Sequence, residues 1–303
     1  MPQISANGIR LEYESFGSAA NPALLLIMGL GAQLTRWTLP FCNKLVERGF
    51  RVIRFDNRDI GLSTHLDGAP VPELATIIAA RMTGLPVHVP YTLHDMAADT
   101  VGLLDALQID AAHIVGASMG GMIAQLVAAD YPQRVLSLTS IMSTTGNASL
   151  PPPTPAASAV LMSRSPHPSD LEAYVKHGLN TLRVIGSPGV PFDEAAARER
   201  LTNDVRRSYN PPGFGRQLAA VTATGDRRDR IRRIKAPTLV VHGADDPLVP
   251  LAGGRDTAEN IAGAELLVIP GMGHDLPPAF YDRVVDAIER VARRADANKS
   301  ATA

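Results

Sequence analysis

The chain has 303 residues, 45% hydrophobic and 19% charged, a composition that excludes a disordered or fibrous protein. With 29 Lys and Arg against 30 Asp and Glu, the net charge of -1 gives no electrostatic reason to expect nucleic acid as a partner. The apolar runs are far shorter than the roughly 20 residues that cross a bilayer, the first residues show no signal-peptide pattern, and the single cysteine, Cys42, has no internal disulfide partner. We therefore expect a cytoplasmic protein that binds neither nucleic acid nor membranes.

The first predicted elements are a hairpin and two strands. Residues 3–16 are predicted as a β-hairpin, because Asn7-Gly8 is a favoured turn pair and the residues after it alternate in polarity. The continuous apolar run at 23–28 is typical of a strand covered on both faces. A helix over 37–48 leads to the next strand at 51–55.

Helical and strand patterns continue to alternate in the middle of the chain. Thr92 and Asp95 have the spacing of a capping box, and apolar residues at helical spacing follow them. A strand at 113–115 then precedes a helix-forming run at 122–127, and residues 135–141 form another strand.

The pattern changes from about residue 143. Residues 143–233 are predicted as short helices without a clear strand, and strands resume at 237–241 and 265–269 before a last helix at 279–293. Alternating strands and helices predict an α/β domain with a mostly parallel, doubly wound sheet. We expect residues 1–142 and 234–303 to form this core domain. Residues 143–233 are then a helical cap over the carboxyl edge of the sheet, where ligands bind in such folds.

The segment Gly116-Ala117-Ser118-Met119-Gly120 stands between a predicted strand and a predicted helix. In this context G-x-S-x-G is a nucleophile elbow, a sharp turn that exposes the serine hydroxyl at the strand end. The glycines suit the turn because a serine in a strained conformation needs neighbours without a Cβ. The motif is weak evidence on its own, since glycine and serine are common turn residues.

Candidate partners for Ser118 stand at the ends of two later strands. Asp245 and Asp246 follow the strand at 237–241, and His274 follows the strand at 265–269 in a glycine-flanked loop. A serine hydroxyl needs a base to take its proton, and the base needs an orienting carboxylate. The chain order Ser, Asp, His is the one found in α/β-hydrolases.

Two stretches point to a known family. Residues 56–64 (Asp-Asn-Arg-Asp-Ile-Gly-Leu-Ser-Thr) and 116–121 (Gly-Ala-Ser-Met-Gly-Gly) resemble bacterial carboxylesterases close to the aclacinomycin methylesterases. The wider resemblance, to the α/β-hydrolase superfamily, covers roughly residues 7–292. It implies the α/β-hydrolase fold with a helical cap insertion.

The resemblance also implies roles for individual residues. Ser118 is the nucleophile, His274 is the general base and then acid, and Asp246 is the orienting carboxylate. Asp246 is favoured over Asp245 because the family's acid usually stands three residues after a glycine, here Gly243. The resemblance implies no cofactor, and the remaining histidines show no metal-ligand spacing.

Backbone N–H groups are expected to bind the oxyanion of the tetrahedral intermediate. The resemblance assigns them to Met119, directly after the nucleophile, and to Leu30 in Met28-Gly29-Leu30-Gly31. Met28 replaces the histidine of the family's His-Gly-x-Gly turn. Each such donor lowers the barrier by about 2.7–4 kcal/mol in comparable sites.

The predicted function is a cofactor-independent serine hydrolase acting on a small-molecule carboxylic ester, with a methyl ester of a larger acid as a special case. Alternatives with the same triad are carbon–carbon bond hydrolysis, amide cleavage at an N-terminal proline, and perhydrolysis. Asp275 and Met119 disfavour the first two, because the corresponding relatives often carry tryptophan there. A non-catalytic ligand receptor is less favoured still. The sequence indicates neither the natural ester nor the oligomeric state.

Several insertion residues are candidates to line a pocket for a medium-sized hydrophobic substrate. They are Met162, Leu182, Tyr209 and Phe214. Asp56 and Arg58 are expected to brace the loop beneath the site through hydrogen bonds and charge pairs. The basic run at 227–235 is interpreted as the solvated face of a helix rather than a nucleic-acid site.

Overall fold

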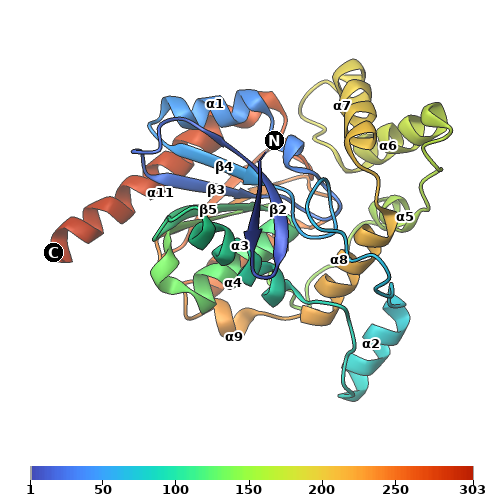
Figure 1. The fold of residues 1–303 in the computed structure, drawn as a ribbon, viewed down its shortest axis with the longest axis horizontal. Helices are drawn as coiled ribbons and strands as arrows, with labels where there is room; N and C mark the ends of the chain where they lie inside the picture. Colours follow the sequence, from blue (N-terminus) through green and yellow to red (C-terminus); the bar gives the residue numbers. More distant parts are fainter. Residues whose placement is uncertain (1, 303) are drawn as a thin grey trace.

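The sheet at the centre of the molecule has eight strands, with helices on both of its faces (Figure 1). The computed structural model describes residues 2–302, with side chains for residues 2–295. The strand order is β1-β2-β4-β3-β5-β6-β7-β8. β2 pairs antiparallel with β1 and β4, whereas every other neighbouring pair is parallel. The predicted mostly parallel, doubly wound α/β sheet is confirmed.

The elements follow the chain in regular alternation up to the insertion. The strands are β1 (Gln3–Ala6), β2 (Ile9–Phe16), β3 (Ala23–Ile27), β4 (Arg51–Phe55), β5 (Ala112–Ala117), β6 (Val135–Ile141), β7 (Thr238–Gly243) and β8 (Glu265–Ile269). The α-helices are α1 (Leu39–Glu47), α2 (Leu74–Thr83), α3 (Leu93–Ala106), α4 (Met119–Asp130), α5 (Pro155–Met162), α6 (Leu171–Ile185), α7 (Glu194–Arg207), α8 (Pro211–Thr224), α9 (Arg228–Ile231), α10 (Leu251–Asn260) and α11 (Tyr281–Thr302). No helix within residues 2–302 has the length and apolar character needed to cross a bilayer.

Local sequence signals account for several of these boundaries. The hairpin turn has positive φ at both Asn7 (49°) and Gly8 (78°), as the favoured two-residue turn requires. The predicted capping box of Thr92 and Asp95 begins α3. The helix expected over 37–48 begins only at Leu39, and α11 continues to Thr302 instead of ending at 293. α2 and α10 were not predicted.

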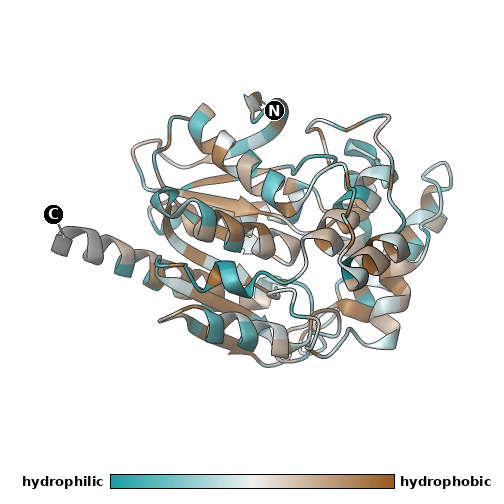
Figure 2. Cartoon of the chain, turned by 90° about the horizontal axis from the view of Figure 1, so that it is seen from below, coloured by the Kyte–Doolittle hydropathy of each residue, from teal (hydrophilic) through white to brown (hydrophobic). Residues whose placement is uncertain are grey.

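Strand β3 shows why the core needs a continuous apolar run. Leu24 and Leu26 belong to the buried cluster that includes residues of α1 and α11, whereas Leu25 and Ile27 belong to the cluster that includes residues of α3 and α4. All four side chains are fully buried. Figure 2 shows brown, hydrophobic strands between helices that also carry teal, hydrophilic turns. The strand is therefore buried on both faces, as predicted.

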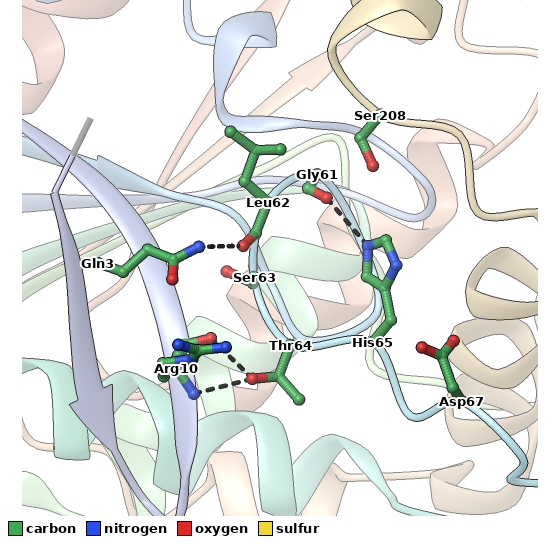
Figure 3. A pocket seen from close by; sticks show the side chains of 9 residues that line it. All are labelled: Gln3, Arg10, Gly61, Leu62, Ser63, Thr64, His65, Asp67 and Ser208. Carbon is green, nitrogen blue, oxygen red and sulfur yellow. Dashed lines mark hydrogen bonds between the residues drawn. The ribbon is translucent and has the colours of Figure 1, made fainter.

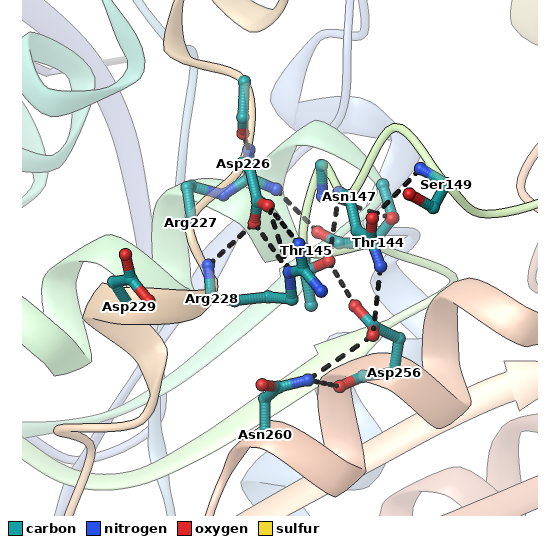
Figure 4. A network of polar contacts seen from close by, with 12 residues as sticks. Thr144, Thr145, Asn147, Ser149, Asp226, Arg227, Arg228, Asp229, Asp256 and Asn260 are labelled. Carbon is teal, nitrogen blue, oxygen red and sulfur yellow. Dashed lines mark hydrogen bonds and ion pairs between the residues drawn. The ribbon is translucent and has the colours of Figure 1, made fainter.

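Between β6 and β7 the described chain is helical or irregular, and its two ends meet in a polar network (Figure 4). The Arg227 guanidinium donates to the Thr144 carbonyl at 2.6 Å, and the Arg227 N–H donates to the Thr145 carbonyl at 2.9 Å. The Thr145 hydroxyl donates to Asp256 of α10 at 2.5 Å. Arg227 is buried, and burial lowers its pKa to about 10, so its assignment to a solvated helix face was wrong.

The loop after β4 attaches the insertion to the core through buried ion pairs. Asp56 pairs with Arg207 of α7 at 2.7 Å, and Asp59 accepts two hydrogen bonds from Arg216 of α8, at 2.8 and 2.7 Å. Between them, Arg58 pairs with Asp99 of α3 at 2.5 Å. Asp56 and Arg58 thus make the charge pairs expected of bracing residues.

Helix α2, from the first part of the chain, also lies against the insertion (Figure 1). The Arg81 guanidinium of α2 donates to the Thr222 carbonyl of α8 at 2.7 Å. The division into a core and a cap at residues 143–233 stays a prediction.

The buried pair of Asp59 and Arg216 is expected to contribute strongly to stability. Burial alone would raise the pKa of Asp59, but its hydrogen bonds, first the one with Arg216, hold that pKa below its usual value. Arg216→Ala leaves this carboxylate buried without its partner, so the free energy of unfolding should fall by about 3–5 kcal/mol. Urea denaturation at pH 7 measures the loss.

Lys44→Ala is the matched control, because Lys44 pairs with Asp282 at 2.6 Å on the surface. Their side chains are 38% and 73% exposed. Exposed pairs of this kind contribute at most about 1 kcal/mol. Equal losses from the two substitutions would contradict the structural role assigned to Asp59 and Arg216.

Candidate active site

The elbow lies where β5 ends and α4 begins. Ser118 has φ 54° and ψ −119°, a strained conformation for a residue with a side chain. A Cβ added to Gly116 would lie 2.1 Å from the Gly120 carbonyl oxygen, and one added to Gly120 would lie 2.1 Å from the Ile27 carbonyl oxygen. Close backbone contacts therefore require glycine at both positions. Gly116 packs within the elbow, and Gly120 packs against the end of β3.

The structure brings Ser118, His274 and Asp246 into one chain of hydrogen bonds. The Ser118 hydroxyl oxygen lies 3.0 Å from His274 Nε2, and His274 Nδ1 lies 2.7 Å from Asp246 Oδ2. The side chain of His274 is 7% exposed and that of Asp246 is fully buried. This is the geometry that a nucleophile, a base and an orienting carboxylate require.

The two neighbouring carboxylates have different surroundings. Asp246 Oδ1 accepts backbone hydrogen bonds from Leu248 at 2.9 Å and Val249 at 2.8 Å, which leaves Oδ2 for His274. Asp245 instead accepts a hydrogen bond from the Gly271 N–H at 2.8 Å. The structure thus places Asp246 rather than Asp245 against the histidine.

His242 is a buried neighbour of this site. Its Nε2 lies 2.8 Å from the Val249 carbonyl and 3.7 Å from Asp246 Oδ2. Burial lowers the pKa of His242 from its ordinary 6.5, so the ring is neutral at neutral pH. It therefore supports the Asp246 turn without adding a charge that would compete with His274. In the sequence, the only feature that links His242 to the site is its position four residues before Asp246.

The turn at residues 28–31 passes next to the nucleophile. A Cβ added to Gly29 would lie 3.1 Å from the Ser118 Cβ and 3.6 Å from its hydroxyl oxygen. Leu30 follows in this turn and Met119 follows Ser118, so both predicted oxyanion donors belong to backbone segments that adjoin the nucleophile.

Two polar side chains that sequence reasoning missed hold this turn. Asn57 donates to the Met28 carbonyl at 2.9 Å, and Gln217 of α8 accepts from the Gly31 N–H at 2.9 Å. Asn57 lies within the 56–64 stretch, and this was the only sequence feature that pointed to a role for it in the site. No local sequence pattern around Gln217 indicates that it contacts the site.

The four predicted pocket residues lie in different surroundings. The Phe214 ring lies against the turn, because a Cβ added to Gly31 would be 2.5 Å from it. Leu182 packs on the buried cluster between α6 and α7, and Tyr209 makes an edge contact with Tyr174, their ring centroids 6.0 Å apart. Met162 is 61% exposed, so it does not belong to the packed part of the insertion.

A separate pocket of about 390 Å³ lies beside the β1–β2 hairpin (Figure 3). None of the predicted site residues lines it. Gln3 donates to the Leu62 carbonyl at 2.7 Å, and His65 Nε2 lies 2.9 Å from the Gly61 carbonyl, so several lining groups already bind one another. Among the side chains of residues 2–295, no group of three or more His, Cys, Asp or Glu is arranged to hold a metal ion.

Known proteins resemble the chain over nearly its whole length. It is 30% identical to the rhodomycin D methylesterase DnrP of Streptomyces peucetius, with 94% of this chain and 95% of that protein aligned. It is also 30% identical to a 2-hydroxy-6-oxononadienedioate/2-hydroxy-6-oxononatrienedioate hydrolase of Burkholderia vietnamiensis, over 88% of this chain and 85% of that one.

Solved structures share the architecture. The meta-cleavage product hydrolase CumD of Pseudomonas fluorescens superimposes with a TM-score of 0.74 at 21% identity, covering 97% of this chain and 98% of that one. Residues 22–277 match the family described as the alpha/beta hydrolase fold. The chain therefore belongs to the α/β-hydrolase family.

Proposed function

We propose that this protein is a serine-dependent carboxylic ester hydrolase. The hydrogen-bonded chain from Ser118 through His274 to Asp246 is the observation that carries the proposal. Family membership and the similarity to methylesterases support ester hydrolysis.

In the first half-reaction, Ser118 attacks the ester carbonyl while His274 Nε2 takes its proton. Asp246 holds the Nδ1 side of the ring and stabilises the imidazolium that forms. The backbone N–H groups of Leu30 and Met119 bind the oxyanion. The intermediate then collapses as His274 gives the proton to the departing alkoxide, which leaves as an alcohol.

In the second half-reaction, water attacks the acyl group on Ser118. His274 takes a proton from this water, and a second tetrahedral intermediate forms over the same two N–H groups. Its collapse breaks the bond to the Ser118 oxygen, which recovers the proton from His274 as the carboxylic acid is released. The cycle uses one histidine as base and acid twice and requires no cofactor.

We further propose a methyl ester of a larger hydrophobic acid as the substrate. The rhodomycin D methylesterases DnrP and DauP, each 30% identical to this chain, support this choice. Methanol is a small leaving group, so most of the binding energy must come from the acyl part of the substrate. Phe214, which lies against the turn at Gly31, is the predicted pocket residue best placed to contact that part.

Carbon–carbon bond hydrolysis is the second candidate, favoured by the similarity to the Burkholderia vietnamiensis hydrolase. A panel containing aromatic methyl esters, p-nitrophenyl esters of increasing chain length and a 2-hydroxy-6-oxo-dienoate separates the two. Methanol release from the methyl esters supports our proposal. Turnover of the dienoate alone would replace it with carbon–carbon hydrolysis.

Ser118→Ala removes the nucleophile. We expect kcat to fall on the order of 10⁶-fold, as in triad enzymes generally. Hydrolysis of p-nitrophenyl esters by the parent and the variant, followed by the release of nitrophenol, measures the effect. Full activity in the variant would show that another residue attacks the ester.

Asp246→Asn and Asp245→Asn form a matched pair of neighbouring substitutions. An amide at 246 favours the wrong tautomer of His274, so kcat should fall by about 10⁴-fold. An amide oxygen at 245 can still accept from the Gly271 N–H, so we expect less than about a 10-fold loss there. The same assay compares the two variants, and a reversed order of the losses would assign the acid to Asp245.

A further inference from the structure

We infer that the insertion positions the catalytic base, with Ser187 and Asp275 as the positioning residues for His274. This inference rests on the proposed function. The segment that follows α6, residues 186–189, lies directly against the loop that carries His274, residues 271–275.

Backbone hydrogen bonds join the two segments. The His274 N–H itself donates to the carbonyl of Ile185, the last residue of α6, at 2.7 Å. The Gly189 N–H donates to the Gly271 carbonyl at 2.9 Å. The main chain of the base is therefore bound to the insertion as well as to the core.

The Ser187 hydroxyl joins both neighbours of His274. It donates to the Asp275 carboxylate and accepts from the Gly273 N–H at 3.0 Å. Because one oxygen makes both contacts, the Ser187 side chain fixes the residue before the histidine relative to the residue after it.

Close glycine packing leaves little space between the segments. A Cβ added to Gly273 would lie 2.3 Å from the Gly186 carbonyl oxygen, and one added to Gly189 would lie 2.6 Å from the Gly271 Cα. Such contacts are possible only when both backbones keep their relative position. Residues 186–189 therefore cannot move toward the histidine loop without a clash, and the hydrogen bonds between the two segments oppose their separation.

Two aspartates of the core hold the loop that carries His274 from the other side. The Asp245 carboxylate accepts from the Gly271 N–H at 2.8 Å, and Asp246 holds the His274 ring at 2.7 Å. Burial raises the pKa of Asp275, and its hydrogen bond with Ser187 opposes this rise, so the hydroxyl supports the charged form of the carboxylate. The charge of Arg200 in α7 favours the same charged form of Asp275. Ser187 thus adds an insertion side chain to the support that the core gives this loop.

The expected consequence is a change in turnover rather than in substrate affinity. His274 transfers a proton in every step, and displacements of about 1 Å in a reacting group can cost 10²-fold. Ser187 and Asp275 support the base and are not assigned to substrate binding. Their loss should lower kcat and leave KM nearly unchanged.

The test compares Ser187→Ala, Asp275→Ala and the double variant, each expressed as kcat per active serine; alanine at 275 removes the acceptor of the Ser187 hydroxyl. End-point titration with a fluorophosphonate counts those serines, so misfolded protein does not enter the result. We expect each single variant to lose about 10–100-fold in kcat, with KM within about 2-fold. The double variant should lose little more than one single variant, because both substitutions break the same contact.

Two further variants complete the design. Ser187→Thr keeps the hydroxyl and should recover most of the parent kcat, whereas Ser163→Ala, at an exposed serine of the insertion, should keep the parent value. A parent-like kcat in titrated Ser187→Ala, or a rise in KM alone, would overturn the inference while the proposed function stands. If the fluorophosphonate does not modify Ser118 in the parent, the proposed function itself fails.

Discussion

Steric crowding at the end of β5 is the constraint on which the candidate site depends. The elbow turns so sharply that Gly116 touches the Gly120 carbonyl, while Gly120 in turn touches the Ile27 carbonyl at the end of β3. This contact fixes the start of α4 over two adjacent strands and leaves Ser118 with a positive φ. It also brings the turn after β3 alongside the nucleophile. The strain is tolerated because buried strands and helices surround the turn on both faces of the sheet.

The loop after β4 connects this crowded centre to the helices of the insertion. In the loop after β4, Asn57 holds the Met28 carbonyl, while Asp56 and Asp59 form ion pairs with arginines of α7 and α8. The turn beside Ser118 and two helices of the insertion are therefore positioned by residues of one short segment, 56–59. Buried ion pairs of this kind contribute orientation more reliably than net stability.

The sequence predicts those features that depend on neighbouring residues. The apolar run of β3 and the Asn7-Gly8 turn are local patterns, and the structure places them as expected. Ser118, Asp246 and His274 were indicated by their separate strand ends and by the family resemblance, and Ser118 and His274 meet across 156 residues. Contacts between distant segments have no such pattern. Gln217 reaches Gly31 across 186 residues, and Ser187 meets Asp275 across 88. The surroundings of Met162 and Leu182 likewise depend on how the helices of the insertion pack, which their apolar character alone does not specify.

The buried carboxylates of the loop after β4 also limit how this protein can be re-engineered. Exchanging the whole insertion for that of a relative would remove Arg207 and Arg216 together, unless the donor carries arginines in the same places. Asp56 and Asp59 would then be buried without counter-charges, and Gly31 would lose the Gln217 side chain that holds it. Replacing the insertion would thus disturb the backbone around Ser118 as well as the proposed substrate pocket. Single substitutions at the proposed pocket residues, beginning at Phe214, offer a route to altered specificity that leaves these ion pairs intact.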